Sequence, residues 1–255
     1  MSARESKLIR TWIVVAWIVL LAAVVGCTTF HYRDVQSDFE RAVRIDNGES
    51  VSPFTADNSS EAYREIINQL SEEQIRELDQ RLQANAWLLR SYSYWRVSDL
   101  GEARSSAGKG IREGKPGAHS RDKVLLLLVP ALVADSETMN AWLAAGKKTS
   151  SQVYENTHEK DFKLAWDKLL EADQEIGDPT SKSTVYYVQY QKWRILQNWR
   201  QVISSFPDSE ESERRAARDR AQDKVGDDLG SAAKSAKNEI PADHTLHKLI
   251  EAQGG

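Results

Sequence analysis

The chain has 255 residues, a formal net charge of −4 at pH 7 and one cysteine. Its lysines and arginines alternate with aspartates and glutamates, so it lacks the basic patch that nucleic-acid binding requires. One cysteine excludes an intramolecular disulfide, and the fold must depend on its hydrophobic core. Six tryptophans beyond residue 26 indicate large aromatic contacts in that core; they are Trp87, Trp95, Trp142, Trp166, Trp193 and Trp199.

Residues 1–26 have the pattern of a secretory signal. Arg4, Lys7 and Arg10 precede an apolar run, and small residues follow it. This order of basic head, apolar middle and small residues at a cut site is typical of a segment removed during export. The apolar run, Thr11 to Val25, is about 15 residues long, whereas roughly 20 are needed to span a bilayer.

The end of this segment, Val24-Val25-Gly26-Cys27, resembles the lipobox of bacterial lipoproteins. In that family the peptidase cuts before the cysteine, here between Gly26 and Cys27. The resemblance implies a covalent diacylglycerol and an N-acyl chain on Cys27, which together hold a protein firmly to a membrane. Thr28 in place of aspartate implies the inner leaflet of the outer membrane, facing the periplasm. Two alternatives are an uncleaved N-terminal anchor and a cleaved signal followed by a free cysteine.

Hydrophobic periodicity predicts helices along the rest of the chain and no strand, so we predict an all-α fold. Residues 27–33 form the expected lipidated tether and residues 34–255 one helical domain, with a candidate sub-boundary near 114–120. The expected helices cover 35–45, 60–70, 72–95, 98–112, 120–134, 137–146, 149–176, 180–206, 208–240 and 244–251.

Two local signals refine these helices. Ser71-Glu72-Glu73-Gln74 is a capping-box sequence, in which the hydroxyl and the glutamine side chain satisfy free backbone amides reciprocally. The apolar run Val124 to Val133 is too short to cross a bilayer and is typical of a helix buried on most sides. Pro130 within it is expected to kink or restart the helix.

The stretch from Ala84 to Gly117 resembles one tetratricopeptide repeat. The residues at the family's packing positions are Trp87, Ser91, Tyr94, Ala103 and Ala107. Arg90 in place of leucine, Gly110 in place of alanine and Pro116 one place late depart from the pattern. The resemblance implies antiparallel helix hairpins stacked as a short tetratricopeptide-like α-solenoid, whose concave face binds another chain or a peptide. The number of repeats is left open.

Several aromatic and basic residues are candidates for contact with a partner, because tyrosine and arginine are frequent at interfaces. They are Tyr92, Arg96, Tyr186, Tyr187 and Tyr190. Core packing is the alternative role for the same side chains. The segment Tyr92 to Arg96 also resembles Tyr190 to Arg194, an echo that chance in a tryptophan-rich chain explains equally well.

Catalytic motifs are missing from the sequence. It has no Gly-x-Ser-x-Gly elbow and no His-Glu-x-x-His, and the glycines at 108 and 110 lack the spacing and the hydroxyl residue of a phosphate loop. His244 and His247 would share one face of the last helix, but solvated terminal histidines are commoner than metal ligands. We therefore expect no enzyme activity, no metal site and no cofactor beyond the lipid on Cys27.

These features predict a lipid-anchored periplasmic protein that binds another envelope protein as an adaptor or assembly factor. Its expected partners are the membrane, through the lipid, and that protein. A transport-system component with a small ligand in a helical pocket is the first alternative, and a deep aromatic pocket at Trp193 and Trp199 would indicate it. The second is an envelope hydrolase, which would require a buried carboxylate pair in a cleft.

Overall fold

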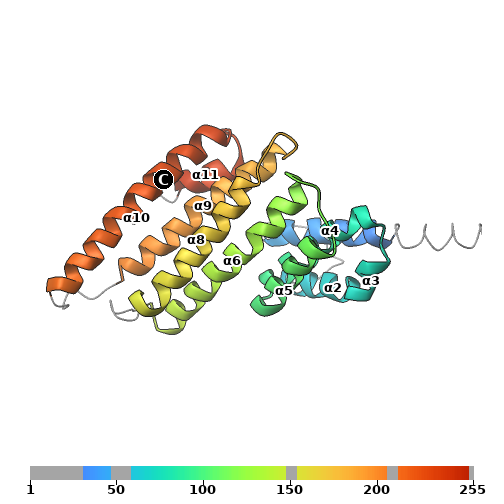
Figure 1. The fold of residues 1–255 in the computed structure, drawn as a ribbon, viewed down its shortest axis with the longest axis horizontal. Helices are drawn as coiled ribbons and strands as arrows, with labels where there is room; N and C mark the ends of the chain where they lie inside the picture. The colour runs from blue at the N-terminus through green and yellow to red at the C-terminus, as the bar shows by residue number, and fades with distance from the viewer. Residues whose placement is uncertain (1–30, 47–58, 148–153, 206–211, 253–255) are drawn as a thin grey trace, which may run out of the picture.

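The computed structural model describes residues 31–46, 59–147, 154–205 and 212–252. All regular secondary structure in these ranges is helical, so the predicted all-α class is confirmed. The helices form one elongated body, with α2 to α5 at one end and α10 and α11 at the other (Figure 1).

A helix over residues 31–46 comes first in the described chain. The elements after it are α2 (Ser59–Gln69), α3 (Glu72–Glu77), α4 (Gln80–Arg96), α5 (Leu100–Arg112), α6 (Arg121–Ala144), the π-helical turn η1 (Tyr154–His158), α8 (Glu159–Gln174), α9 (Lys182–Ile203), α10 (Ser212–Glu239) and α11 (Thr245–Ala252). Each long helix from α4 onward packs against the next in the chain, and α6, α8, α9 and α10 lie side by side in that order (Figure 1).

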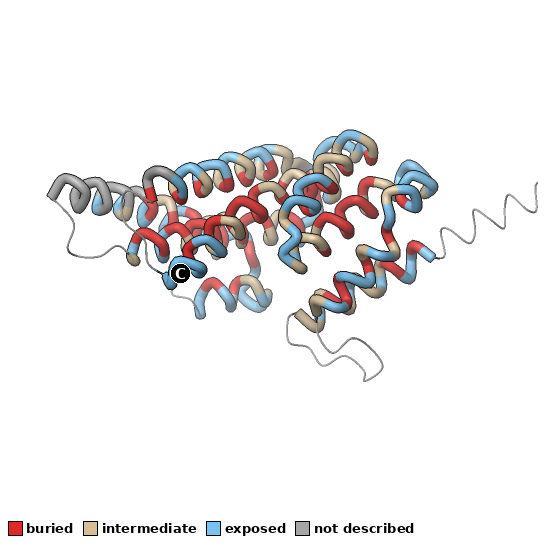
Figure 2. Tube along the Cα trace, turned by 90° about the horizontal axis from the view of Figure 1, so that it is seen from below, coloured by how far each residue is buried: buried red, intermediate tan, exposed pale blue. Residues whose placement is uncertain are grey.

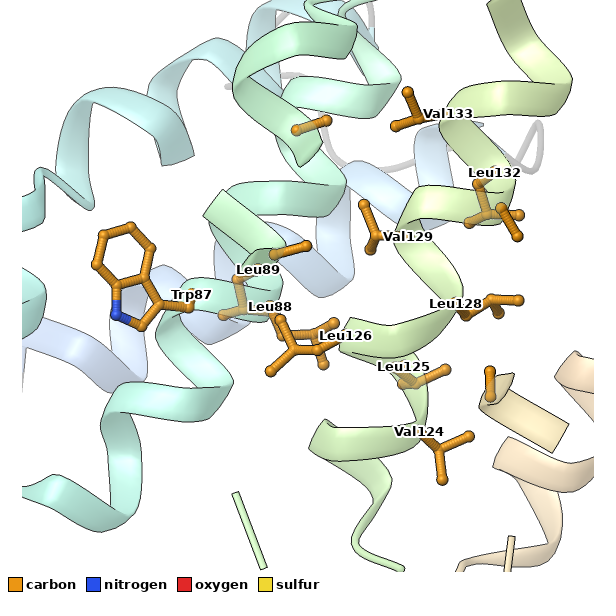
Figure 3. Packing of buried hydrophobic residues seen from close by; sticks show 14 of the residues in the cluster. Trp87, Leu88, Leu89, Val124, Leu125, Leu126, Leu128, Val129, Leu132 and Val133 are labelled. Carbon is orange, nitrogen blue, oxygen red and sulfur yellow. The ribbon is translucent and has the colours of Figure 1, made fainter. Parts of the chain in front are cut away.

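Helix α6 lies at the centre of the fold and packs against α4, α5, α8 and α9. Leu126, Val129 and Val133 point toward α4 and α5, whereas Leu128 and Leu132 point the opposite way (Figure 3). All five side chains are buried. A helix covered on opposite faces must be apolar around most of its circumference. Its length and composition would also suit a membrane span, but 56% of its most apolar window is buried inside the protein.

The prediction of separate helices over 120–134 and 137–146 is wrong, since α6 runs unbroken through Pro130 to Ala144. Proline removes one backbone hydrogen bond and crowds the preceding turn, which by itself favours a break. Here the packing of α6 between helices on both sides outweighs that cost. The candidate sub-boundary near 114–120 falls in the connection between α5 and α6.

The prediction of one continuous helix from the Ser71 capping box to residue 95 is also wrong. Leu78 is extended, with φ −67° and ψ 155°, and it separates α3 from α4. The Asp79 side chain then accepts a hydrogen bond from the Arg81 backbone N–H at 3.0 Å and caps α4. The Ser71 capping box is confirmed: Ser71 Oγ accepts from Gln74 N at 3.2 Å and Gln74 Oε1 from Ser71 N at 2.8 Å.

Near the N-terminus, the structure corrects part of the expected tether. Residues 31–33 are helical, and Tyr32 is buried with its hydroxyl donating to Asn85 Oδ1 at 2.6 Å. The signal over 1–26, Cys27 and the rest of the tether lie outside the described residues. The expected helix over 149–176 is described from residue 154, where η1 precedes α8.

Buried apolar side chains form two clusters in the described ranges. One extends from the helix over 31–46 to α9, and the other lies among α6, η1, α8, α9, α10 and α11. Helices α6, α8 and α9 contribute to both, and Trp166 packs against both. Buried residues therefore recur along the whole body (Figure 2). Of the six tryptophans predicted to make core contacts, Trp87, Trp142, Trp193 and Trp199 are buried, and Trp95 and Trp166 are half-buried.

Candidate ligand-binding groove

A groove of about 480 Å³ is lined by side chains from the helix over 31–46, α2, α4, α6, α9 and α11. We name it the Tyr92–Tyr187 groove after two aromatic residues that line it. Its apolar lining includes Phe39, Val43, Leu88, Leu125, Leu246 and Leu249. Helices distant in sequence build it, because α4 and α9 both pack against the central α6.

Four of the five residues predicted to contact a partner line this groove. Tyr92 and Arg96 come from α4, and Tyr187 and Tyr190 come from α9. The fifth, Tyr186, is absent from the lining and packs edge-on against His244, with ring centroids 5.5 Å apart. The structure thus brings together residues from two distant parts of the sequence; their contact with a partner stays a prediction.

Three aromatic rings of the groove, those of Tyr92, Trp95 and Tyr187, form one connected set. Tyr92 lies edge-on to Trp95 with centroids 5.7 Å apart, and it lies 6.4 Å from the ring of Tyr187. Trp95 is held in place by a hydrogen bond from its Nε1 to Ser136 Oγ at 2.9 Å. Offset and edge-on aromatic pairs of this kind stabilise a rigid apolar surface.

Two arginines lie over the Trp95 ring. The guanidinium carbon of Arg96 is 5.1 Å and that of Arg194 is 5.7 Å from the ring centroid, within cation–π range. Arg96 also forms an ion pair with Asp46. These contacts place both guanidinium groups at the groove, and Arg96 is at the same time exposed to solvent.

Behind Arg194 lies a buried carboxylate, Asp135 on α6. Arg194 Nη2 donates to Asp135 Oδ2 at 3.0 Å, and Asn198 Nδ2 donates to the same carboxylate at 3.0 Å. Burial raises the pKa of Asp135, and this effect outweighs the lowering by Arg194 and Asn198. Asp135 thus fixes the position of Arg194 at a cost in desolvation.

Two polar side chains of the groove are uncharged. Burial, and then the neighbouring Tyr187, raises the pKa of Tyr92 well above its usual value, so its hydroxyl remains a neutral phenol at physiological pH. Gln191 is 2% exposed, and its Oε1 accepts no hydrogen bond from the described residues. A buried acceptor left unpaired is destabilising, and it is commonly satisfied by a ligand or by water.

Sequence reasoning missed Trp95, Gln191 and Arg194 as groove residues. The echo between Tyr92-to-Arg96 and Tyr190-to-Arg194 could have found them, because both segments line the groove. Three residues of each segment line the groove; Ser93, Tyr94, Lys192 and Trp193 do not, and Trp193 is fully buried in the second core cluster. Arg121 carried no sequence signal at all; it belongs to the groove only because α6 begins beside α4.

The tetratricopeptide-like packing positions lie on α4 and α5, two helices that contact each other along the chain. Four of these residues, Trp87, Ser91, Ala103 and Ala107, are buried, and Tyr94 is half-buried. Arg90, which departs from the family pattern, is also buried and donates to the Leu70 carbonyl at 2.7 Å.

Two features would indicate the alternative functions: an aromatic pocket at Trp193 and Trp199 for a transport-system component, and a buried carboxylate pair for an envelope hydrolase. Trp193 and Trp199 lie in the second core cluster, and Trp199 stacks on Phe162 with centroids 5.5 Å apart. They line neither the Tyr92–Tyr187 groove nor a smaller cavity of about 240 Å³ beside Tyr32 and Leu70. Asp135 is the only buried carboxylate in the described ranges, and its partners there are Arg194 and Asn198.

His247 in α11 and His244 just before this helix both contact backbone groups of neighbouring residues. His247 Nδ1 lies 2.8 Å from the Ile240 carbonyl, and His244 Nδ1 accepts from the Leu246 N–H at 3.2 Å. Within the part of the chain that the structure describes, no group of three His, Cys, Asp or Glu residues could hold a metal ion.

No protein-family model, curated protein or solved structure matches the chain. The groove must therefore be interpreted from its own chemistry.

Proposed function

We propose that this protein is a lipid-anchored adaptor or assembly factor of the bacterial envelope, which binds a segment of another envelope protein in the Tyr92–Tyr187 groove. The convergence of Tyr92 and Arg96 with Tyr187 and Tyr190 carries this proposal. Tyrosine, tryptophan and arginine dominate the binding energy of protein interfaces, and all three line this groove. Its volume suits a few side chains of a partner rather than a flat contact.

The helical framework supports a binding role. Helices α4 and α9 are each held by the central α6, so the groove residues sit on packed elements rather than on loops. The buried Trp87 and Ala103 of the α4–α5 hairpin support a tetratricopeptide-like arrangement, in which stacked hairpins present a face for another chain. The groove offers phenols, guanidiniums and amides, which bind a partner without any reaction.

The proposed location rests on the resemblance of Val24 to Cys27 to a lipobox. In this proposal Cys27 carries the lipid, and the helical body faces the periplasm from the inner leaflet of the outer membrane. Two or more acyl chains hold a protein to a bilayer far more firmly than one.

Replacing the cysteine tests this location. We expect Cys27→Ala to move the protein from the membrane fraction to the soluble or unprocessed fraction, because its acyl chains are lost. Immunoblotting of the soluble fraction and of the separated inner and outer membranes measures the shift. A Cys27→Ala protein that fractionates as the wild type does would contradict lipidation.

The binding role can be tested by cross-linking in intact cells, purification of the anchored protein and mass spectrometry of what accompanies it. We expect one stoichiometric envelope protein with the wild type. Tyr187→Ala should lose it, because Tyr187 lines the groove. Tyr186→Ala is the matched control, since it alters the adjacent half-buried tyrosine outside the lining. Equal recovery with both variants, or a wild type without a partner, would contradict the proposal.

A small ligand of a transport system is the second candidate function. The groove volume of about 480 Å³ favours it, because this is an ordinary size for a small-molecule site. Native mass spectrometry of the purified full chain distinguishes the two. A bound small molecule that Tyr187→Ala loses and Tyr186→Ala retains would favour this second function over the adaptor.

A further inference from the structure

The charges at the Tyr92–Tyr187 groove occur in pairs, because an acidic residue lies beside each arginine of its lining. The pairs are Arg96 with Asp46, Arg194 with Asp135, and Arg121 with Asp122, its neighbour in the chain. Asp122 accepts a hydrogen bond from the Asn85 amide at 2.9 Å, and this neutral amide leaves the carboxylate its negative charge. When all these groups are ionised, their charges cancel.

Asp135 and its partner Arg194 differ in accessibility. The Asp135 carboxylate is 2% exposed and is absent from the groove lining, whereas Arg194 lines the groove with 25% of its side chain exposed. The guanidinium carbon of Arg194 lies 5.7 Å from the centre of the Trp95 ring, so its charge lies at the aromatic part of the groove. An occupant would meet the positive charge directly and the negative charge only from behind it.

The ionisation of Asp135 determines whether the charge of Arg194 is cancelled. Arg194 Nη2 donates to Asp135 Oδ2 at 3.0 Å, and Asn198 Nδ2 donates to both carboxylate oxygens at 3.0 Å. Burial nevertheless raises the pKa of Asp135, because removing the carboxylate from water outweighs these contacts. Protonation of this one buried group would leave one uncompensated positive charge at the groove without any movement of a helix.

Charged residues on the other helices that pack against α6 have partners of their own. These helices are α4, α5, α8 and α9. Their ion pairs include Arg96 with Asp46, Arg104 with Glu137, Lys168 with Glu171 and Lys192 with Asp173. Among the described residues, Arg194 and Asn198 are the side chains that act on the pKa of Asp135. The charge state of Asp135 is therefore set by burial and by these two neighbours.

From this arrangement we infer that Asp135 sets the selectivity of the groove: its ionised carboxylate restricts the site to an uncharged aromatic or aliphatic segment of the partner, and its protonation admits an anionic group beside Arg194. This inference rests on the proposed function and specifies how the same site selects its occupant. The apolar lining supplies the contact area in both states, and charge complementarity distinguishes them. Acidic surroundings would therefore change which segment binds.

Two fluorescent probes that share one ring system test this selectivity. Anilinonaphthalene sulfonate carries a fixed negative charge, and phenylnaphthylamine has the same rings without the sulfonate. Each probe is titrated into the purified full chain in detergent, and the signal from Tyr187→Ala is subtracted as uptake outside the groove. At neutral pH, Asp135→Asn should lower the Kd of the sulfonate relative to that of the neutral probe by about two- to fivefold, as a partly exposed charge does.

Asp173→Asn is the matched control. It also removes an aspartate that pairs with a cation of α9, but neither Asp173 nor Lys192 lines the groove, so the ratio of the two Kd values should not change. Asp135→Asn combined with Arg194→Gln should restore the wild-type ratio, because both charges of the pair are gone. As pH falls toward the ordinary aspartate value of 3.8, the wild-type ratio should approach that of Asp135→Asn at the same pH.

The outcomes separate this inference from the function on which it rests. Equal ratios for wild type and Asp135→Asn, with both probes still requiring Tyr187, would overturn the selectivity and leave the binding groove standing. An equal effect of Asp173→Asn would also overturn it, since net charge alone would then explain the change. No signal beyond that of Tyr187→Ala would overturn the groove and the inference together. If circular dichroism shows that Asp135→Asn does not fold, a wild-type ratio that is constant with pH overturns the inference.

Discussion

At the residue scale, Arg90 shows how one buried charge joins two helices. It is 8% exposed; its Nη1 donates to the Leu70 carbonyl at 2.7 Å and its Nη2 to the Tyr94 hydroxyl at 3.2 Å. Its guanidinium also lies over the rings of Trp87 and Tyr94. Arg90 therefore satisfies a free carbonyl at the end of α2 from within α4. The tetratricopeptide pattern has leucine at this position, which could not do so.

Replacing Arg90 with that leucine should destabilise the protein. We expect Arg90→Leu to lower the free energy of unfolding by about 1–3 kcal/mol, because the buried Leu70 carbonyl would lose its charged donor. Urea denaturation followed by circular dichroism measures the change. Arg81→Leu, at a side chain that is 87% exposed, is the control and should change stability by less than about 0.5 kcal/mol. Equal stability of the two variants would contradict this role for Arg90.

Asp135 leads to a prediction about pH. Because burial raises its pKa in the folded chain above the ordinary 3.8, the unfolded chain loses this proton first as pH rises. Stability from this residue is therefore full below pH 3.8 and falls as pH rises toward the folded pKa. As pH rises through this window, we expect the free energy of unfolding of the wild type to fall relative to that of Asp135→Asn.

Urea denaturation at a series of pH values, with the two proteins compared at each, tests this prediction. Taking the difference between the proteins removes the contributions of other titrating groups. A difference between wild type and Asp135→Asn that is constant with pH, or that grows in favour of the wild type, would refute the assignment.

At the scale of elements, α5 approaches α4 and α6 closely through Gly110. A Cβ added there would lie 2.6 Å from Leu126 Cδ2 and 2.9 Å from Trp87 Cβ. Such distances require a side chain or a helix to shift. The family pattern has alanine at this place, and glycine replaces it because three helices converge there.

Gly110→Ala should consequently lower the free energy of unfolding by about 1–3 kcal/mol, the usual cost of overpacking a core. Gly101→Ala on the same helix meets no atom within 4 Å and should stabilise the protein by up to about 1 kcal/mol through helix propensity. Thermal denaturation of both variants measures the contrast. If both substitutions stabilise the chain, the close approach of α5 to α4 and α6 is incorrect.

The elements also show what sequence could and could not predict. Local signals sufficed for the all-α class, the Ser71 capping box and most helix ends. They failed at Pro130, where packing on both faces of α6 outweighs a local penalty, and at Leu78, where one extended residue breaks a continuous apolar period. Four groove residues followed from their side-chain type. Arg121 and Gln191 did not, because their role depends on which helices become neighbours.

At the scale of the whole molecule, the two core clusters share α6, α8 and α9. Neither cluster can lose its helices without exposing apolar surface of the other. We expect one cooperative unfolding transition, with coincident midpoints by circular dichroism and by tryptophan fluorescence. Gly110→Ala should shift both probes together, although Gly110 lies beside the first cluster alone. Two separate transitions would show that the clusters unfold as independent units.

The groove combines side chains from the first and the last described helices. Phe39, near the start of the described chain, lines it together with Leu246 and Leu249 of α11, the last described helix. A nascent chain that has emerged only as far as α9 could already bury much of the first cluster, yet it would lack one wall of the site. In the proposed binding role, competence would thus require α11 and would be lost on proteolytic removal of that helix, so a partner that docks here would distinguish molecules with α11 from molecules without it.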